Sequence, residues 1–390
     1  MNSEQQYIDL FTAQREALSA LSAPVMNALR ERAFEDFCRL GFPSRKVERY
    51  RYTDVAEAFA PDYGVNVRGI SFPVNPYQAF RCDVPNLSTS LYFVVNDRFY
   101  DGDRPRATLP EGVIIDSLSR VARERPELVE PYYGRLARSS KDAVNALNTM
   151  LAQDGLFVYV PRNVVVPRPI QVVNILRADV PLMANRRMLV VVEEGAQLQM
   201  LVCDHAMDEH PFLVTQVVET FVGENAHIEC YELEETHPRN HRFSNTYADL
   251  STHSTATLGS ITLGCGLTRN RMDVTLGGEY GEANLIGAVI ADGEQHADNN
   301  TLIDHRAPNC QSRELYKYVL DGSAVGAFAG RVLVREGAQK TTSQETNANL
   351  CATRTARMYT QPMLEIYADD VKCSHGSTVG QLNDAALFYM

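Results

Sequence analysis

A short pattern recurs in the second half of the chain at a nearly constant spacing. Four copies of a small residue, any residue and a large aliphatic residue follow one another at steps of 30, 30 and 27 residues: Ala196-x-Leu198, Ala226-x-Ile228, Ala256-x-Leu258 and Ala283-x-Leu285. Each copy lies in a strand-like alternation, so its two apolar members face the same way. A unit that recurs at this spacing is typical of a solenoid, in which each turn covers the apolar face of the turn before it. The pattern therefore predicts a mainly β fold, a β-solenoid with these pairs stacked inside; a β-sandwich with coincidental spacing is the alternative.

The first part of the chain has a different periodicity. Apolar residues at helical spacing predict one helix around residues 7–18 and an amphipathic helix over residues 25–40, which Gly41 ends. Residues 91–95 are predicted to be a short buried strand, and residues 114–153 return to helical periodicity. From Leu156 onward, short β-branched runs alternate with Gly, Asn and Asp. We therefore expect a mostly helical N-terminal domain over residues 1–154 and a β core over residues 155–376.

A strand-like stretch near the end of the chain carries two candidate metal ligands. Apolar and polar residues alternate over residues 364–368, and Asp369-Asp370 marks a break before Cys373 and His375. In extended backbone, residues i and i+2 point to one face with Cα atoms roughly 6 to 7 Å apart. The thiol and the imidazole are therefore expected to stand side by side, where they could share a metal or a cluster.

Two donors do not complete a metal site. Zinc or an iron-sulfur cluster usually takes about four protein or sulfide ligands, so this site would need a second chain or a bound species. Lys372 and a protonated His375 would favour the thiolate form of Cys373, and Asp369 and Asp370 would oppose it. A buried structural cysteine beside a structural histidine is the alternative interpretation of the pair.

The residues from Leu364 to Gln381 resemble the SufB/SufD family of iron-sulfur cluster assembly proteins. Lys372-Cys373-Ser374-His375-Gly376 is similar to the SufD form of the family's motif. Upstream stretches that also resemble the family are Asp304-His305, residues 316–322, residues 338–342 and an N-terminal signature over residues 43–53. The resemblance covers nearly the whole chain and implies a right-handed parallel β-helix as the core.

The same resemblance implies a non-catalytic scaffold subunit that helps to build and transfer iron-sulfur clusters. In the family, SufD and SufB join through their β-helical domains, and each recruits one copy of the ATPase SufC. His375 matches the SufD histidine at the proposed assembly site, where a SufB cysteine faces it, and Cys373 is its neighbour on the same face. Cys373 and His375 are therefore expected to hold iron or a transient iron-sulfur cluster that is shared with a SufB-like partner.

Nucleotide chemistry is expected on other chains. No P-loop GxxxxGK[ST] occurs here, so ATP is assigned to the SufC-like partner alone. Complexes of the family are also associated with reduced flavin, but no dinucleotide fingerprint places a flavin site on this chain. The resemblance leaves open whether the isolated chain forms a homodimer through the edge that SufB would occupy.

Charge and cysteine usage exclude other classes of function. The net charge is −12 with no basic run, so the phosphate backbone of a nucleic acid would be repelled. The eight cysteines are scattered without CxxC spacing, which predicts reduced thiols rather than a disulfide framework. The N-terminus has no signal pattern, and no apolar run approaches the roughly 18 residues that span a bilayer. We expect a cytoplasmic protein that neither enters a membrane nor binds nucleic acid.

The last residues suggest a third segment. Asn383 is a good helix N-cap, and residues 385–389 have the composition of a helix start. We expect residues 377–390 to begin a C-terminal helical region that looks truncated, because members of the family continue for several more helical turns. That region is the SufC-binding part in the family, so SufC binding by this chain stays open.

Three rival interpretations remain. A carbohydrate-active β-helix enzyme would need converging carboxylates on an outer face, and His227, Glu229 and Tyr231 do share one strand face. A structural β-solenoid that assembles into filaments is the second. The basic residues within residues 45–51 could bind an anion, but a solvated face paired with local acids is the simpler interpretation.

Overall fold

The computed structural model describes residues 3–68, 75–79, 89–102 and 109–381. Its helices are α1 (Ser3–Ala20), α2 (Pro24–Leu40), α3 (Val55–Ala58), α4 (Pro76–Ala79), α5 (Leu118–Glu124) and α6 (Ala143–Leu151), with the 3-10 helices η1 (Glu48–Tyr50), η2 (Pro126–Leu128) and η3 (Ser139–Lys141). Its strands are β1 (Gly64–Val65), β2 (Ser90–Val95), β3 (Arg98–Phe99), β4 (Ile114–Ser117), β5 (Leu156–Val160), β6 (Ile170–Leu176), β7 (Leu182–Val192), β8 (Gln197–Ala206), β9 (Phe212–Val222), β10 (His227–Glu235), β11 (Asn240–Leu250), β12 (Thr255–Gly264), β13 (Leu267–Leu276), β14 (Glu282–Ala291), β15 (His296–His305), β16 (Gln311–Leu320), β17 (Val325–Val334), β18 (Thr341–Cys351), β19 (Arg357–Ile366) and β20 (Val371–Gln381).

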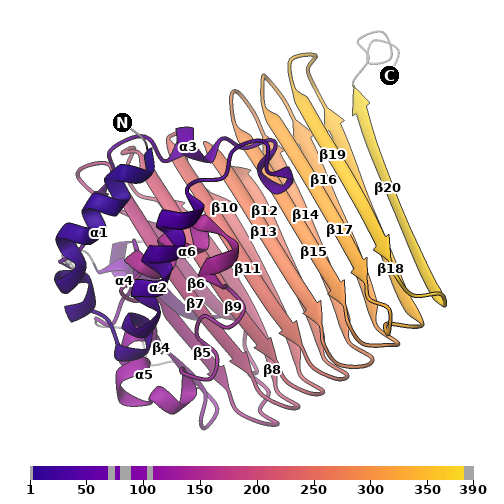
Figure 1. Ribbon diagram of the computed structural model, residues 1–390, viewed down its shortest axis with the longest axis horizontal. Coiled ribbons are helices and arrows are strands. Elements are labelled where there is room, and N and C mark those ends of the chain that lie inside the picture. Colours follow the sequence, from indigo (N-terminus) through magenta and orange to yellow (C-terminus); the bar gives the residue numbers. More distant parts are fainter. Residues whose placement is uncertain (1–2, 69–74, 80–88, 103–108, 382–390) are drawn as a thin grey trace.

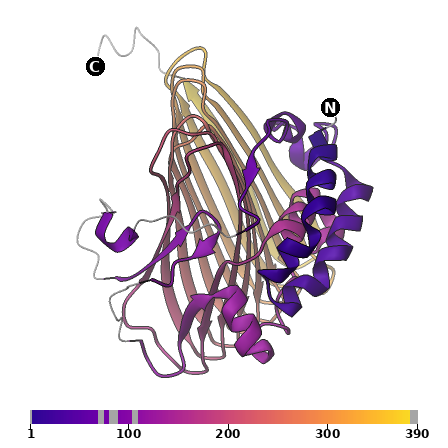
Figure 2. The ribbon, with the colours of Figure 1, turned by 90° about the vertical axis from the view of Figure 1, so that its left-hand side faces the viewer.

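Two facing parallel sheets form the body of the molecule. Alternate strands from β5 to β19 make one sheet, called here the odd sheet, and those from β6 to β20 make the other, the even sheet. Because successive strands alternate between the sheets, the chain winds through about eight turns, which run from the N-terminal helices to β20 at the opposite end (Figure 1). Figure 2 looks along this coil from its N-terminal end, with the helices against one wall. The predicted parallel β-solenoid is confirmed.

The four Ala-x-aliphatic pairs lie in the interior, as predicted. Every one of their eight side chains is at most 3% exposed and belongs to the large core cluster between the two sheets. The register differs from the sequence spacing at one step, because Ile228 pairs with Ala256 and not with Leu258. A slip of two residues keeps the same side chains inward, since strand side chains alternate with period two. The column therefore continues unbroken.

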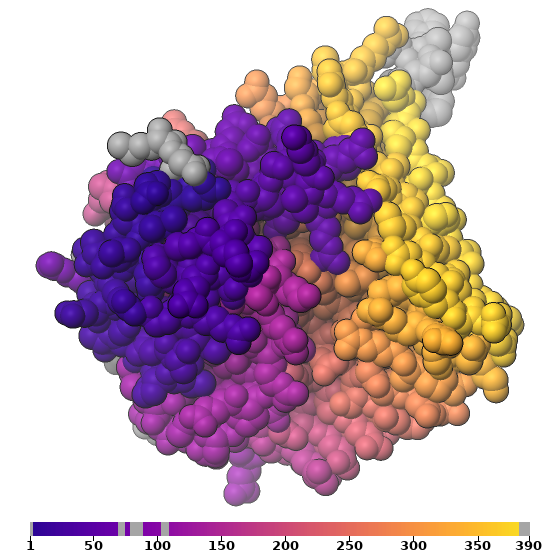
Figure 3. Space-filling view, viewed as in Figure 1, coloured from indigo at the N-terminus to yellow at the C-terminus, as the bar shows by residue number. Residues whose placement is uncertain are grey.

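The N-terminal region covers the outer face of the odd sheet over its early turns. Its aromatic core residues, Phe37 and Phe59 among them, pack with Met183, Leu213 and Phe243 of β7, β9 and β11. Strand β7 is consequently buried along its whole length, whereas β16 of the even sheet alternates between buried and exposed. Figure 3 shows the early residues spread over one part of this face. Residues 48–52 reach further, to β19, where the Tyr52 ring stacks on Tyr359 and the Gln361 side chain donates a 3.0 Å hydrogen bond to Glu48.

The boundary between the two parts is less sharp than the expected change after residue 154. The helices predicted around residues 7–18 and over 25–40 are α1 and α2, Gly41 ends α2, and the predicted strand at 91–95 is β2. The helical prediction for residues 114–153 is wrong at its start, because Ile114–Ser117 forms β4 and pairs antiparallel with β5. Strands β2 and β4 extend the two sheets with residues from before position 154, since each pairs directly with a strand of the solenoid.

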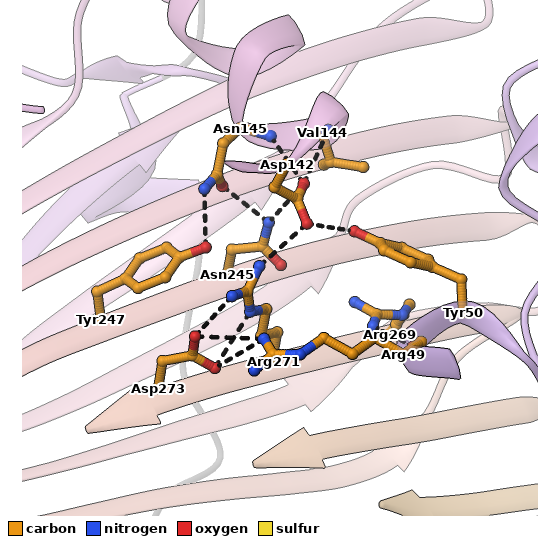
Figure 4. A network of polar contacts seen from close by, with 10 residues as sticks. All are labelled: Arg49, Tyr50, Asp142, Val144, Asn145, Asn245, Tyr247, Arg269, Arg271 and Asp273. Atoms are coloured by element: carbon orange, nitrogen blue, oxygen red, sulfur yellow. Dashed lines mark hydrogen bonds and ion pairs between the residues drawn. The ribbon is translucent and has the colours of Figure 1, made fainter. Parts of the chain in front are cut away.

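A buried polar network fixes the N-terminal region to the solenoid (Figure 4). Asp142 caps α6 by accepting hydrogen bonds from the backbone N–H groups of Val144 (2.9 Å) and Asn145 (3.2 Å). Its other oxygen accepts a 2.6 Å bond from the Tyr50 hydroxyl and lies 3.0 Å from Arg271 Nη1 on β13. Three segments that are distant in sequence therefore share one carboxylate.

The C-terminal end of the solenoid differs from the expected domain plan. Residues 377–381 continue β20 and pair with Asn347–Cys351 of β18, so they are not the start of a helix. The ladder to β18 overrides the local helix signal because each residue gains its backbone hydrogen bonds from the neighbouring strand. The helix expected from residue 385 lies outside the described residues.

Candidate functional site

Cys373 and His375 lie on one face of β20, the last strand of the even sheet. Cys373 pairs in register with Ser343 and His375 with Glu345, both on β18. Cys373 is half-buried against Val332, Val334 and neighbouring apolar residues, whereas His375 is exposed. The two donors thus share a face, as predicted, and that face is the interior side of the final turn.

The pair occupies the same two interior columns as the Ala-x-aliphatic repeats. Following the register, Ala283 and Leu285 on β14 lie beside Ser312 and Glu314 on β16, which lie beside Ser343 and Glu345 on β18. Cys373 and His375 follow on the next strand. The columns therefore change from apolar to polar two turns before the candidate ligands.

The two glutamates in these columns are buried without partners. Glu314 and Glu345 are each 1% exposed, and none of their four carboxylate oxygens has a hydrogen-bond partner of ordinary geometry. Burial raises the pKa of Glu314 to about 8, although the nearby Thr301 hydroxyl acts against this shift. Burial, and then the charge of Glu314, raise the pKa of Glu345 to about 9. Both carboxyl groups are therefore neutral at pH 7.

The neighbouring column is a short hydrogen-bonded line. The Ser312 hydroxyl donates to the Ser343 hydroxyl at 2.8 Å and lies 2.9 Å from Nε2 of His305, on the odd sheet. Burial lowers the pKa of His305 to about 4, so its imidazole is neutral at pH 7. His305 is therefore a neutral histidine with a structural hydrogen bond to Ser312.

Burial, rather than the charged residues that flank it in sequence, sets the protonation state of the Cys373 thiol. Burial raises the pKa of its thiol, with the backbone of Ser343 acting in the opposite direction. Lys372, which was expected to favour the thiolate, is exposed on the opposite face because the side chains of a strand alternate. Cys373 is thus a neutral thiol before any metal arrives.

Gly330, on β17 across the interior, makes room for the carboxyl group of Glu345. A Cβ atom at position 330 would overlap this carboxylate and would lie 2.8 Å from the Phe328 ring. We expect Gly330→Ala to lower the free energy of unfolding by about 1–3 kcal/mol, the usual cost of overpacking. Glu345→Ala in the Gly330→Ala background should recover part of that loss, as urea unfolding would show. If Gly330→Ala lowers the free energy of unfolding equally in the wild type and in the Glu345→Ala variant, this account of the contact is wrong.

The candidate ligand set is incomplete among the described residues. Across residues 3–68, 75–79, 89–102 and 109–381, no group of three or more His, Cys, Asp or Glu side chains is arranged to hold a metal ion. Within the same ranges, β20 pairs on one side only, with β18, and its outer edge is unpaired. Ile366, Tyr367 and Val379, in or next to the last two strands, are 40%, 63% and 47% exposed. An open edge beside exposed apolar side chains is a place where a partner can add.

The other sequence candidates form ordinary structural contacts. The seven described cysteines are free thiols, and Cys82 lies outside the described residues. On the outer face of β10, His227 Nε2 lies 3.2 Å from Glu229 Oε1, a half-exposed pair. Of the basic residues at 45–51, Arg45 lies 3.7 Å from Asp54, a local acid as expected, whereas Arg49 lies 3.3 Å from the largely buried Asp273 on β13.

Both parts of the chain match known families. Residues 1–172 match the SufBD protein N-terminal region, and residues 175–390 match the SUF system FeS cluster assembly, SufBD core domain. The chain belongs to the SufBD family. The junction between the two matches falls within β6, so the SufBD core begins where the regular turns of the solenoid do.

Similar SufBD proteins come from bacteria and plants. Iron-sulfur cluster assembly protein SufD of Escherichia coli (strain K12) is 26% identical over 392 residues, which cover 100% of this chain and 87% of that protein. The iron-sulfur cluster assembly SufBD family protein slr0076 of Synechocystis sp. is 29% identical over 367 residues, with 90% and 79% covered. Protein ABCI7, chloroplastic, of Arabidopsis thaliana is 26% identical over 400 residues, with 98% and 81% covered. The resemblance to SufD inferred from the C-terminal motif is confirmed.

Membership of the SufBD family weighs against the rival functions. The outer-face residues His227, Glu229 and Tyr231 lie on β10, a regular solenoid strand, where Glu229 contacts His227 and accepts a 3.3 Å hydrogen bond from Gln199. Among the described residues, no helix has the length and apolar character needed to cross a membrane.

Proposed function

We propose that this chain is a SufD-like, non-catalytic subunit of a cytoplasmic iron-sulfur cluster assembly scaffold. It pairs with a SufB-like chain at the open end of the solenoid, and a SufC-like ATPase joins through the region beyond β20. A transient cluster, or iron, is shared between Cys373 and His375 on this chain and donors of the SufB-like partner. The observation that carries this proposal is the placement of a thiol and an imidazole side by side on a terminal strand whose outer edge has no partner strand among the described residues.

The chemistry of the pair suits temporary binding. The raised pKa of Cys373 means that a metal ion must displace the thiol proton when it binds, so the isolated thiol stays unreactive. Thiolate and neutral imidazole both bind iron, and a mixed set is expected to release a cluster more readily than four thiolates. His375 is exposed and can meet a partner donor without rearranging the core. ATP hydrolysis and any flavin chemistry are assigned to other sites of the complex.

The test is a substitution of His375 in the assembled complex. The chain is co-expressed with its SufB-like and SufC-like partners and purified without oxygen, and its iron and acid-labile sulfide are measured. We expect His375→Ala to leave the complex intact and to reduce the iron and sulfide contents by at least about tenfold. Substituting a residue that only supports a metal ligand already lowers metal affinity by about tenfold or more, and His375 is proposed as a ligand itself.

The matched control is His227→Ala, which removes a half-exposed histidine from the outer face of the same sheet. It should leave iron and sulfide unchanged. If His375→Ala also leaves both contents unchanged, the cluster chemistry belongs to the SufB-like chain alone and this chain is only a structural partner.

A further inference from the structure

The acidic pair, Glu314 and Glu345, occupies positions of its column that are apolar in the preceding turns. One turn earlier, the same position holds Leu285, which is 1% exposed and packs in the core. Glutamate at two successive turns replaces buried apolar surface with two carboxyl groups, one directly beside the other. The next position along the column is His375, at the open end.

No positively charged side chain in the described part of the chain compensates the acidic pair. Among the described residues, no Lys, Arg or His side chain forms an ion pair or hydrogen bond with either carboxylate. His305, which lies 2.9 Å from the Ser312 hydroxyl of the adjoining column, is held neutral by burial. Burying polar groups without partners costs free energy, about 1–3 kcal/mol for each group by protein substitution data. Because the chain keeps two such groups side by side despite this cost, we expect them to serve a function other than stability.

The interior is also shaped around one of these groups. The carboxylate of Glu345 fills the space that any side chain at position 330 would occupy, and position 330 is glycine. The hydroxyls of Ser312 and Ser343 follow the same two turns in the adjoining column. Polar oxygen atoms thus gather at one depth inside a solenoid whose earlier turns are apolar at these positions.

We propose that Glu314 and Glu345 bind a divalent metal cation inside the solenoid, one turn behind Cys373 and His375. Two carboxylates balance the charge of a dication, and carboxylate oxygen is the ligand type that Mg²⁺ and Mn²⁺ prefer. Water completes the coordination shell, as it does where a protein supplies only one or two carboxylates. Binding releases one proton from each carboxyl group, so the site and its ion together are neutral. The ion enters past the last turn, where His375 is exposed.

The two neighbouring sites would select different metals. Cys373 offers sulfur, which favours soft or borderline ions, whereas the acidic pair offers only oxygen. Binding to the acidic pair can therefore be measured on the isolated chain, with no partner and no cluster, and it stands or falls separately from the scaffold function. Mn²⁺ is the probe, since it prefers oxygen ligands and its EPR signal distinguishes free from bound ion.

The test measures Mn²⁺ binding at pH 8 to the full chain and to four variants. We expect one ion to bind to the wild type, and Glu345→Gln and Glu314→Gln each to weaken binding by at least about tenfold. Glu336→Gln, which changes an exposed carboxylate in the turn after β17, should bind as the wild type does. The double variant Cys373→Ala/His375→Ala should also retain the ion.

Three results would overturn the inference. They are no binding to the wild type, equal binding to the glutamine variants, and loss of binding in the Cys373→Ala/His375→Ala variant alone. Glutamine keeps the volume of glutamate and cannot ionise, so both variants should fold at least as stably as the wild type. Thermal unfolding of each variant checks that weaker binding does not come from a damaged fold.

Discussion

Asp142→Ala is expected to lower the free energy of unfolding by about 4 kcal/mol. Breaking one partner out of a buried ion pair costs about 3–5 kcal/mol, because the remaining charge is left without compensation. Here that charge is Arg271, whose side chain is 10% exposed beside a 3% exposed Asp142 side chain. Arg271 keeps Asp273 as a second acidic partner at 2.6 Å, so the lost ion pair contributes the lower end of this range. The substitution also removes the cap of α6 and the acceptor for the Tyr50 hydroxyl. The helical region should therefore loosen from the solenoid before the turns themselves unfold.

The matched control is Asp54→Ala. Asp54 also caps a helix, because it accepts a 3.0 Å bond from the backbone N–H of Glu57, but its side chain is 39% exposed and its ion pair with Arg45 is long. Loss of an exposed cap and a surface pair costs only about 1 kcal/mol. Urea unfolding gives both values. Similar losses for Asp142→Ala and Asp54→Ala would show that the buried network does not fix the N-terminal region.

The solenoid could be predicted because its repeat is apolar. The four copies from Ala196 to Leu285 share both a spacing and an apolar character. The spacing alone or the character alone would have been weak evidence for a repeat. The same columns continue through Ser312-x-Glu314 and Ser343-x-Glu345 to Cys373-x-His375. Sequence reasoning missed this continuation because a search for apolar pairs passes over a serine and a glutamate. The signal was present in the spacing, which stays close to one turn.

Contacts between distant segments decided the places where prediction failed. Residues 114–117 and 377–381 become strands because β5 and β18 offer them backbone partners, and local helix signals do not register that gain. The thiol of Cys373 is governed by the apolar residues around it and not by Lys372, its neighbour in sequence. That the candidate ligands face the interior, directly behind two buried acids, follows from the strand register and could not be read from the motif.

The stability of the chain is expected to fall as the pH rises from 7 to 9. Glu314 and Glu345 have pKa values of about 8 and 9 in the folded chain, against an ordinary value of 4.5. A group whose pKa is raised by folding binds its proton more tightly in the native state, so its contribution is complete below the unfolded pKa and is lost as the pH passes the folded pKa. For this pair the loss begins above the unfolded pKa of 4.5 and continues to about pH 9, and the part of it between pH 7 and pH 9 amounts to about 3 kcal/mol.

Urea unfolding at pH 7 and pH 9, with EDTA present to remove divalent ions, measures this loss. The double variant Glu314→Gln/Glu345→Gln has no proton to lose at these positions, so its unfolding free energy should change by about 3 kcal/mol less than that of the wild type over the same interval. Glu336→Gln, an exposed site, should follow the wild type. Parallel pH dependence in the wild type and the double variant would mean that the two carboxyl groups are already ionised at pH 7. Their burial would then need a compensating charge that no described side chain provides.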